Sequence, residues 1–230
     1  MSQSAVRDPW PWNDRPADLS LTAFAVNQSD DAEICQFAWT MVLRGAGEEY
    51  VAEYIGELLS DTDCADLPDS EFARMSAHLF AARRAQQHRW VDRQITPNLT
   101  SAFADLEAAA ILARGDFSCC GTCAAGEIWD ERDDSRHWRG YVTFTTQDTE
   151  SMLEDGSVYL SYGIFPPEGF DPVAYDQIPL DERESAYRAE FEQFMTEVLS
   201  ILDRHQLQPS WNNGSDTRVL LSNPQWYVTV

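Results

Sequence analysis

Apolar residues in the first half of the chain recur every three or four positions, the spacing that places side chains on one face of an α-helix. Four stretches with this spacing follow one another, at about residues 29–44, 51–59, 70–90 and 97–110. In the first stretch, the predicted core face carries Ile34, Phe37, Ala38, Met41 and Val42. Gly45 and Gly47 come directly after it, and glycine commonly ends a helix. The first half is therefore predicted to be helical.

The second half alternates apolar and polar residues in two stretches, 140–146 and 158–164, as strands with one buried face do. A short helix is predicted between them near 148–156, and a long helix with core-spaced aromatic residues at about 181–205. Two short strands flank the Asn213-Gly214 turn signal, and residues 226–230 are predicted to add a last strand. These elements predict an α+β fold, with a helical N-terminal half followed by a small mixed β-sheet with covering helices.

This order of elements predicts three parts: an extended tail at residues 1–20, a helical region at 21–112 and an α+β region at 113–230. The α+β region carries a cysteine cluster, and we expect it to form one compact unit with the helical region. The tail contains a proline–tryptophan run at residues 9–12, where proline favours extended backbone.

The chain is strongly acidic, with 39 acidic residues against 16 basic ones and a net charge of −23. Such a charge repels nucleic acid and anionic membranes, so neither is expected as a partner. All the basic residues are arginine, and the absence of lysine excludes Schiff-base chemistry and a P-loop. The acidic residues form either a solvated surface or a surface for a basic protein partner.

No apolar run is long enough to cross a bilayer, and the first residues lack the features of a signal peptide. We therefore expect a cytoplasmic protein. The sequence indicates no oligomeric state.

Three of the five cysteines, Cys119, Cys120 and Cys123, fall within five positions. Cys120 and Cys123 form a C-x-x-C pair, and at the start of a helix such a pair supports thiol–disulfide exchange, because the helix amides stabilise a thiolate. Pro166 favours this chemistry, at a distance that suits a cis-proline facing the dithiol. The predicted order of elements disfavours it, because four helices precede the pair and no strand–helix–strand unit introduces it.

Two other interpretations of the cysteine cluster stay open. Zinc prefers four ligands, so a zinc site would need Cys35, Cys64 or His137 to complete the three clustered sulfurs. Free cysteines are also often small buried residues that only pack. Zinc is the one cofactor that the sequence indicates, and only under the first of these interpretations.

A second group of polar residues, Gln147, Asp148 and Glu150, follows a predicted strand and opens the short predicted helix. Such residues either cap the helix or bind a ligand. The four histidines show no pairing typical of a metal site.

The stretch from Leu99 to Arg218 resembles a bacterial family known as domain of unknown function 6891. The residues that carry the resemblance are Ala102-Phe103, Leu106-Glu107, Asp116–Cys120, Cys123, Gly140–Val142, Gln147–Glu150, Leu160–Gly163, Trp211, Gly214-Ser215 and Arg218-Val219. The resemblance implies a cytoplasmic bacterial protein in which the cysteine and Gln147–Glu150 segments belong to one unit. It adds Trp211 and Ser215 as candidate binding residues, and it names no activity.

The leading prediction is a non-catalytic acidic module that binds or regulates another protein, because the chain is acidic and catalytic motifs are missing. The alternatives are a thiol–disulfide oxidoreductase that uses Cys120 and Cys123, and a zinc-binding protein that uses the same cluster.

Overall fold

The structure is a computed structural model that describes residues 13–24, 26–89 and 96–230. The tryptophans of the predicted tail and the end of the predicted third helix lie outside the described residues. Contacts within the chain divide it into two compact units, Met1–Ile95 with Tyr227–Val230, and Thr96–Trp226. We call them the helical unit and the sheet unit.

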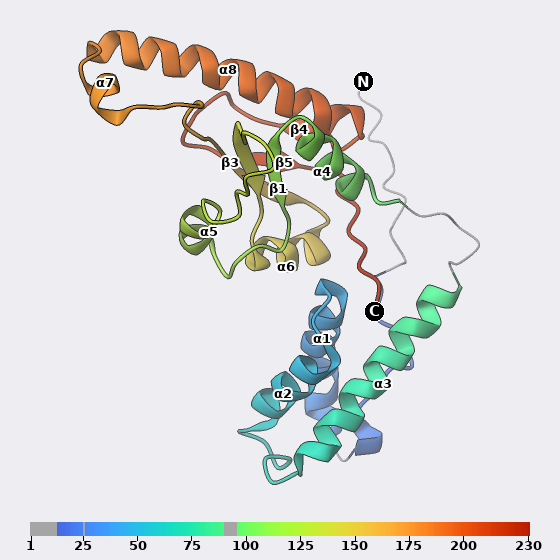
Figure 1. The fold of residues 1–230 in the computed structure, drawn as a ribbon. Coiled ribbons are helices and arrows are strands. Elements are labelled where there is room, and N and C mark those ends of the chain that lie inside the picture. Colours follow the sequence, from blue (N-terminus) through green and yellow to red (C-terminus); the bar gives the residue numbers. More distant parts are fainter. Residues whose placement is uncertain (1–12, 25, 90–95) are drawn as a thin grey trace. The chain divides into compact units, whose positions relative to one another are not determined.

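The described part of the helical unit contains the 3-10 turn Thr22–Phe24 and the helices α1 (Gln28–Arg44), α2 (Glu48–Leu59) and α3 (Asp69–His88) (Figure 1). Most of the predicted core positions of α1 are buried, but Phe37 is 46% exposed and its predicted place in the core is wrong. The buried stripe of α1 runs instead through Cys35 and Trp39, which are fully buried. At 3.6 residues per turn, a stripe centred on those residues leaves Phe37 on the solvent side.

Polar side chains of α3 form hydrogen bonds with Asn13, before the first helix, and with Val228, near the C-terminus. Arg83 donates from Nη2 to the Val228 carbonyl oxygen at 3.2 Å and to Asn13 Oδ1 at 3.3 Å. Gln87 donates to the same Val228 carbonyl at 3.3 Å. The strand predicted at residues 226–230 is therefore wrong: no strand forms there, and Val228 bonds to helix side chains.

The sheet unit is built on a five-stranded sheet with strand order β1-β2-β3-β5-β4. The strands are β1 (Ile111–Arg114), β2 (Gly140–Thr143), β3 (Val158–Ile164), β4 (Pro209–Ser210) and β5 (Val219–Leu221). β1 and β2 are parallel, and the other pairs are antiparallel. A helical first half and a small mixed sheet with covering helices confirm the predicted α+β class.

One face of the sheet carries the larger apolar core, in which Val142 and Leu160 of the sheet share a cluster with Phe194 and Val198. The helices α4 (Asn98–Ala108) and α8 (Leu180–Arg204) cover this face. The N-terminal turns of α8 and the short helix α7 (Pro172–Asp176) extend beyond the sheet (Figure 1). α4 belongs to the sheet unit, although its sequence pattern continues that of the preceding helices.

The opposite face carries a smaller core of Leu112, Ile128, Trp138 and Phe165. Leu112 lies between Ile111 and Ala113, which contribute to the larger core, because successive side chains of a strand point to opposite faces. Phe117 packs against the smaller core as well. The residues on either side of the cysteine cluster, Phe117 and Ile128, therefore anchor that segment on this face.

Candidate functional site

The cysteine cluster lies in the connection between the two parallel strands. The chain leaves β1 at Arg114, passes the cysteines, forms the helix α5 (Gly121–Glu127) and returns to β2 at Gly140. The expectation that no strand–helix–strand unit introduces the C-x-x-C pair is thus wrong. The sequence pattern does not predict β1, because this strand has only four residues and follows α4 almost directly.

The loop between β1 and the cysteines is fixed by backbone hydrogen bonds. The Phe117 amide donates to the Phe144 carbonyl at 3.0 Å, and the Thr146 amide donates to the Ser118 carbonyl at 3.1 Å. Asp116 and Ser118 have positive φ angles of 53° and 60°, which turn the chain sharply before the cluster. The loop is therefore bound to the residues that follow β2, at the carboxyl ends of both parallel strands.

The sulfur atoms of Cys119, Cys120 and Cys123 all lie within 4.8 Å of one another. Cys119 is exposed, and Cys120 and Cys123 are partly buried. Cys35 and Cys64, by contrast, are buried in the helical unit. The packing interpretation fits that second pair, and it does not fit the cluster, whose thiols reach solvent.

The surroundings of the cluster shift the pKa values of two of its thiols in opposite directions. Cys120 is the N-cap residue of α5. The backbone amides at the start of α5, that of Cys123 above all, together with the neighbouring Cys123 and Cys119 thiols, lower the pKa of Cys120. The Cys123 thiol bonds to the sulfurs of Cys119 and Cys120, whose negative charge raises the pKa of Cys123 to about 11. Cys120 is the thiol that ionises more easily of these two.

The same three sulfurs are the only group of potential metal ligands of this kind among the described residues. Zinc–sulfur bonds of about 2.3 Å place the sulfurs of a tetrahedral site somewhat under 4 Å apart, so small movements would bring them to one ion. A fourth ligand is missing from the group: Cys35 and Cys64 are buried in the helical unit, and His137 is exposed and outside the cluster. The residues present therefore suit three-coordinate binding better than a closed structural site.

Pro166 does not follow the predicted geometry. No cis peptide bond occurs among the described residues, so the expected cis-proline is wrong. The Phe165 amide donates to the Arg139 carbonyl at 2.9 Å, which continues the pairing of β2 and β3 by one residue. Pro166 comes next and begins the loop after β3.

The residues of the Gln147–Glu150 segment lie in the first turns of α6 (Thr146–Asp155), next to the cysteine loop through the Thr146–Ser118 bond. Asp148 forms a capping box with Thr145 and accepts from Arg218 at 2.9 and 2.7 Å. Burial acts to raise the pKa of Asp148, but the bonds from Arg218 and Thr145 outweigh it and lower that pKa. Gln147 is exposed and Glu150 is half-buried. Asp148 thus has a structural role that its spacing from Thr145 made foreseeable.

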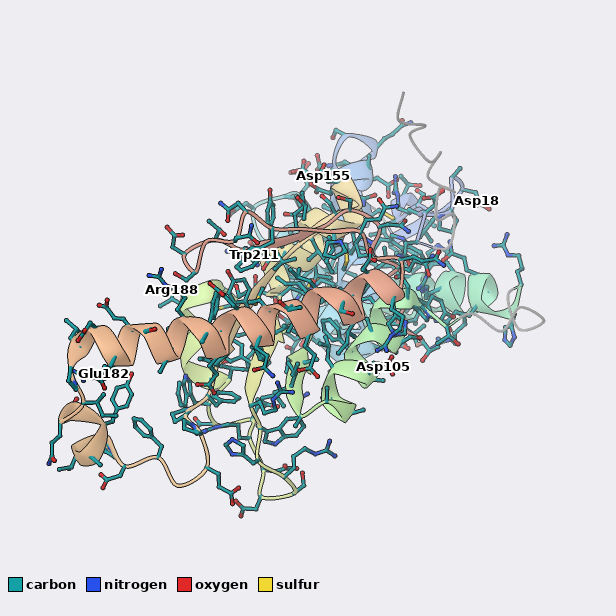
Figure 2. All side chains as sticks on the ribbon, turned by 90° about the horizontal axis from the view of Figure 1, so that it is seen from above. Asp18, Asp105, Asp155, Glu182, Arg188 and Trp211 are labelled. Carbon is teal, nitrogen blue, oxygen red and sulfur yellow. The ribbon has the colours of Figure 1, made fainter. Side chains whose placement is uncertain are left out.

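The candidate residues Trp211 and Ser215 lie in the segment between β4 and β5. Trp211 donates from Nε1 to the Tyr162 hydroxyl at 2.8 Å and packs edge-on against Phe191 of α8, beside which Figure 2 shows it. The Tyr162 hydroxyl also lies 2.6 Å from the Thr217 carbonyl, to which it donates. Ser215 is exposed. Trp211 therefore packs against the larger core. The segment between β4 and β5 is joined to the Gln147–Glu150 segment by the ion pair of Arg218 with Asp148.

A family model described as domain of unknown function (DUF6891) matches residues 27–229. The chain belongs to this family. The predicted resemblance is confirmed, and the DUF6891 match extends over both units rather than residues 99–218 alone. No curated protein and no solved structure matches the chain. Among the described residues of this DUF6891 protein, no helix combines the length and apolar character needed to span a membrane.

Proposed function

We propose that the sheet unit of this DUF6891 protein is a thiol–disulfide exchange module, with Cys120 as the attacking thiol and Cys123 as the resolving thiol. The observation that carries the proposal is the convergence of three solvent-accessible sulfurs within 4.8 Å of one another at the start of α5. The strand–helix–strand setting supports it, since ligand sites in sheets of this kind form beyond the carboxyl ends of parallel strands.

The exchange takes two steps. The Cys120 thiolate attacks one sulfur of a substrate disulfide, forms a mixed disulfide and releases the other substrate sulfur as a thiolate that takes up a proton. Cys123 then loses its proton, attacks the Cys120 sulfur and releases the second substrate thiol. The protein ends with a Cys120–Cys123 disulfide, and the substrate disulfide has gained two electrons. An external thiol reductant reverses these steps on the protein and restores the dithiol.

The difference between the two thiols supports this division of roles. A lowered pKa increases the thiolate fraction of Cys120 near neutral pH, and only the thiolate attacks. Cys123, with a pKa of about 11, stays protonated until Cys120 is consumed in the mixed disulfide and its charge is removed. Its attack is intramolecular, so the short sulfur–sulfur distance compensates for the weaker acidity.

The test is thiol release from a small symmetric disulfide, bis(2-hydroxyethyl) disulfide, by the reduced full-length protein. The wild-type protein should release two small thiols per molecule. Cys120→Ser should slow the release by at least about tenfold, because the most acidic of the two motif thiols is lost. Cys123→Ser should instead stop at the mixed disulfide, which intact-mass spectrometry detects as one added half of the reagent.

Cys119→Ser and Cys64→Ala serve as controls that keep both motif thiols. If Cys119→Ser stops at the mixed disulfide and Cys123→Ser does not, Cys119 is the resolving thiol and the assigned pair is wrong. Equal rates for wild-type protein and Cys120→Ser would exclude Cys120 as the attacking thiol and overturn the proposed exchange.

Zinc binding is the second candidate function, since the three converging sulfurs favour a soft ion as well. Elemental analysis of protein purified without added metal tests it: about one zinc per chain, lost in Cys120→Ser, supports it, and a content near zero contradicts it. The predicted binding of another protein fits either function. A substrate carried on a basic protein would be attracted by the net charge of −23.

A further inference from the structure

A concave surface lies in the helical unit, outside the sheet unit that carries the cysteine cluster. It is a groove of about 890 Å³ between α2 and α3, lined by Glu48, Glu49, Ala52, Glu53, Gly56, Glu57, Ser60, Ala65, Asp69, Phe72 and Ala73. The lining residues from Glu49 to the C-cap residue Ser60 follow the three- and four-residue spacing of one helix face. The groove therefore runs along the length of α2.

Small residues form one row of the groove lining. Ala52 and Gly56 of α2 and Ser60, the residue after its end, lie about one turn apart. The ring of Phe72 lies against Gly56, so close that a Cβ atom added there would be 3.2 Å from it. Small residues in such a row let the backbone of a second helix come close, and Phe72 offers a ring to pack on.

The rim of the groove is acidic. Glu48, Glu49, Glu53, Glu57 and Asp69 line it, and no arginine does. Glu48 is 3.6 Å from Arg84, whereas the other four carboxylates form no ion pair within the described part of the chain. Glu49, Glu53 and Glu57 repeat at four-residue spacing, where like charges repel and destabilise an isolated helix. A cationic occupant would relieve this repulsion.

These carboxylates do not form a metal site. The 12 residues of α2 extend over about 18 Å, so its carboxylates are spread along the groove, and the one potential metal-ligand group of the described residues is the cysteine cluster. Charge distributed beside the apolar residues of the groove matches an elongated partner with both properties.

We propose that the groove between α2 and α3 binds a basic amphipathic α-helix of a partner protein. The apolar face of that helix packs on Ala52, Gly56 and Phe72, and its lysine or arginine side chains pair with Glu49, Glu53 and Glu57. The inference is independent of the thiol chemistry, which belongs to the sheet unit. It gives the predicted acidic binding surface a defined location.

The probe is a fluorescein-labelled peptide of about 18 leucine and lysine residues, with leucines at i, i+3, i+4 and i+7, long enough to be helical in water. Fluorescence anisotropy with the full-length protein should show binding that weakens as sodium chloride is raised, because salt screens exposed charges. Glu53→Gln with Glu57→Gln should weaken binding about tenfold. Ala52→Arg, which adds a cation to the groove lining, should weaken it further.

The matched control is Glu182→Gln with Glu184→Gln, which removes the same charge from exposed positions of α8 and should leave the affinity within about twofold of wild type. A scrambled peptide of the same composition, without an apolar face, should bind at least about tenfold more weakly. The proposal is overturned if the wild-type protein does not bind the helical peptide. It is equally overturned if the scrambled peptide binds as well, or if the α8 variant loses as much affinity as the groove variant.

Discussion

Arg218 and Asp148 form a two-point ion pair, with guanidinium nitrogens 2.9 and 2.7 Å from the two carboxylate oxygens. Arg218 precedes β5 and Asp148 lies in the first turn of α6, so the pair joins elements 70 positions apart in the sequence. The same carboxylate accepts from the Thr145 amide at 2.9 Å, where it completes the cap of α6. One side chain thus holds the start of α6, whose Thr146 amide in turn bonds to the cysteine loop.

Arg218→Gln should lower the free energy of unfolding by about 1–3 kcal/mol, because the partly buried Asp148 carboxylate loses its two charge-assisted bonds. Urea denaturation followed by circular dichroism measures this. Arg188→Gln, at an exposed position of α8 shown in Figure 2, is the matched control and should change stability by less than about 0.5 kcal/mol. Equal losses in the two variants would contradict a stabilising role for the pair.

The lowered pKa of Asp148 predicts an acid-dependent part of this stability. A carboxyl group whose pKa is lower in the folded protein stabilises it fully above the unfolded value of about 3.9, and the contribution is lost as pH falls through the folded pKa. The stability difference between the wild-type protein and Asp148→Asn should therefore be constant near neutral pH and shrink below about pH 4. Urea titrations at several pH values test this, and a difference that grows on acidification would contradict it.

The parts of the fold that follow from the sequence are those with long one-sided patterns. α1, α8 and β3 each place several apolar residues on one face, and tertiary packing uses that face. The predicted burial of Phe37 is wrong because an apolar stripe rotated by about one residue fits the sequence pattern almost as well. The burial of Trp39 shows which of the two stripes faces the core. The sequence does not predict β1, because a strand of four residues gives too short a pattern.

The sequence pointed to the cysteines of the candidate site, but not to the strands and helices that surround them. The cysteine spacing identified the cluster, but the parallel pairing of β1 with β2 depends on long-range contacts that no local pattern records. Likewise, Arg218 as the partner of Asp148 follows only from the strand order of the sheet.

The two motif thiols should react with iodoacetamide at different rates. Near pH 8, Cys120 should be alkylated before Cys123, because the pKa of Cys120 is lowered and that of Cys123 is raised to about 11. Tandem mass spectrometry of early time points locates each adduct. The buried Cys35 should react only after denaturation, which serves as the internal control. Initial rates for Cys123 that match those for Cys120 would contradict the assigned acidities.

Two glycine substitutions in the sheet unit should have opposite effects. Gly163 pairs with Tyr141 across β2 and β3, and a Cβ atom there would lie 2.6 Å from the tyrosine ring. Gly163→Ala should therefore destabilise the protein by about 1–3 kcal/mol. Gly126 lies in α5 with nothing within 4 Å of an added Cβ, so Gly126→Ala should stabilise by up to about 1 kcal/mol. Chemical denaturation compares both, and the same sign for both changes would contradict the packing of Tyr141 on β3.

The hydroxyl of Tyr162 connects β3 to the segment that carries Trp211. It accepts from Trp211 Nε1 at 2.8 Å and donates to the Thr217 carbonyl at 2.6 Å. Tyr162→Phe keeps the ring, which packs against Trp211 and Phe191, but it leaves the indole N–H and the carbonyl without this partner. We expect a loss of about 1–3 kcal/mol in the free energy of unfolding, measured by urea denaturation, together with a change in tryptophan fluorescence.

Tyr159→Phe is the matched control for that change, since Tyr159 is on the same strand, is 50% exposed, and its hydroxyl has no hydrogen bond within the described part of the chain. Its removal should change stability by less than about 0.5 kcal/mol. If both tyrosine variants unfold at the same urea concentration as the wild-type protein, the Tyr162 hydroxyl does not hold the Trp211 segment. The position of Trp211 would then depend on its ring contacts with Tyr162 and Phe191 and on its bond to the Gly214 carbonyl at 3.2 Å.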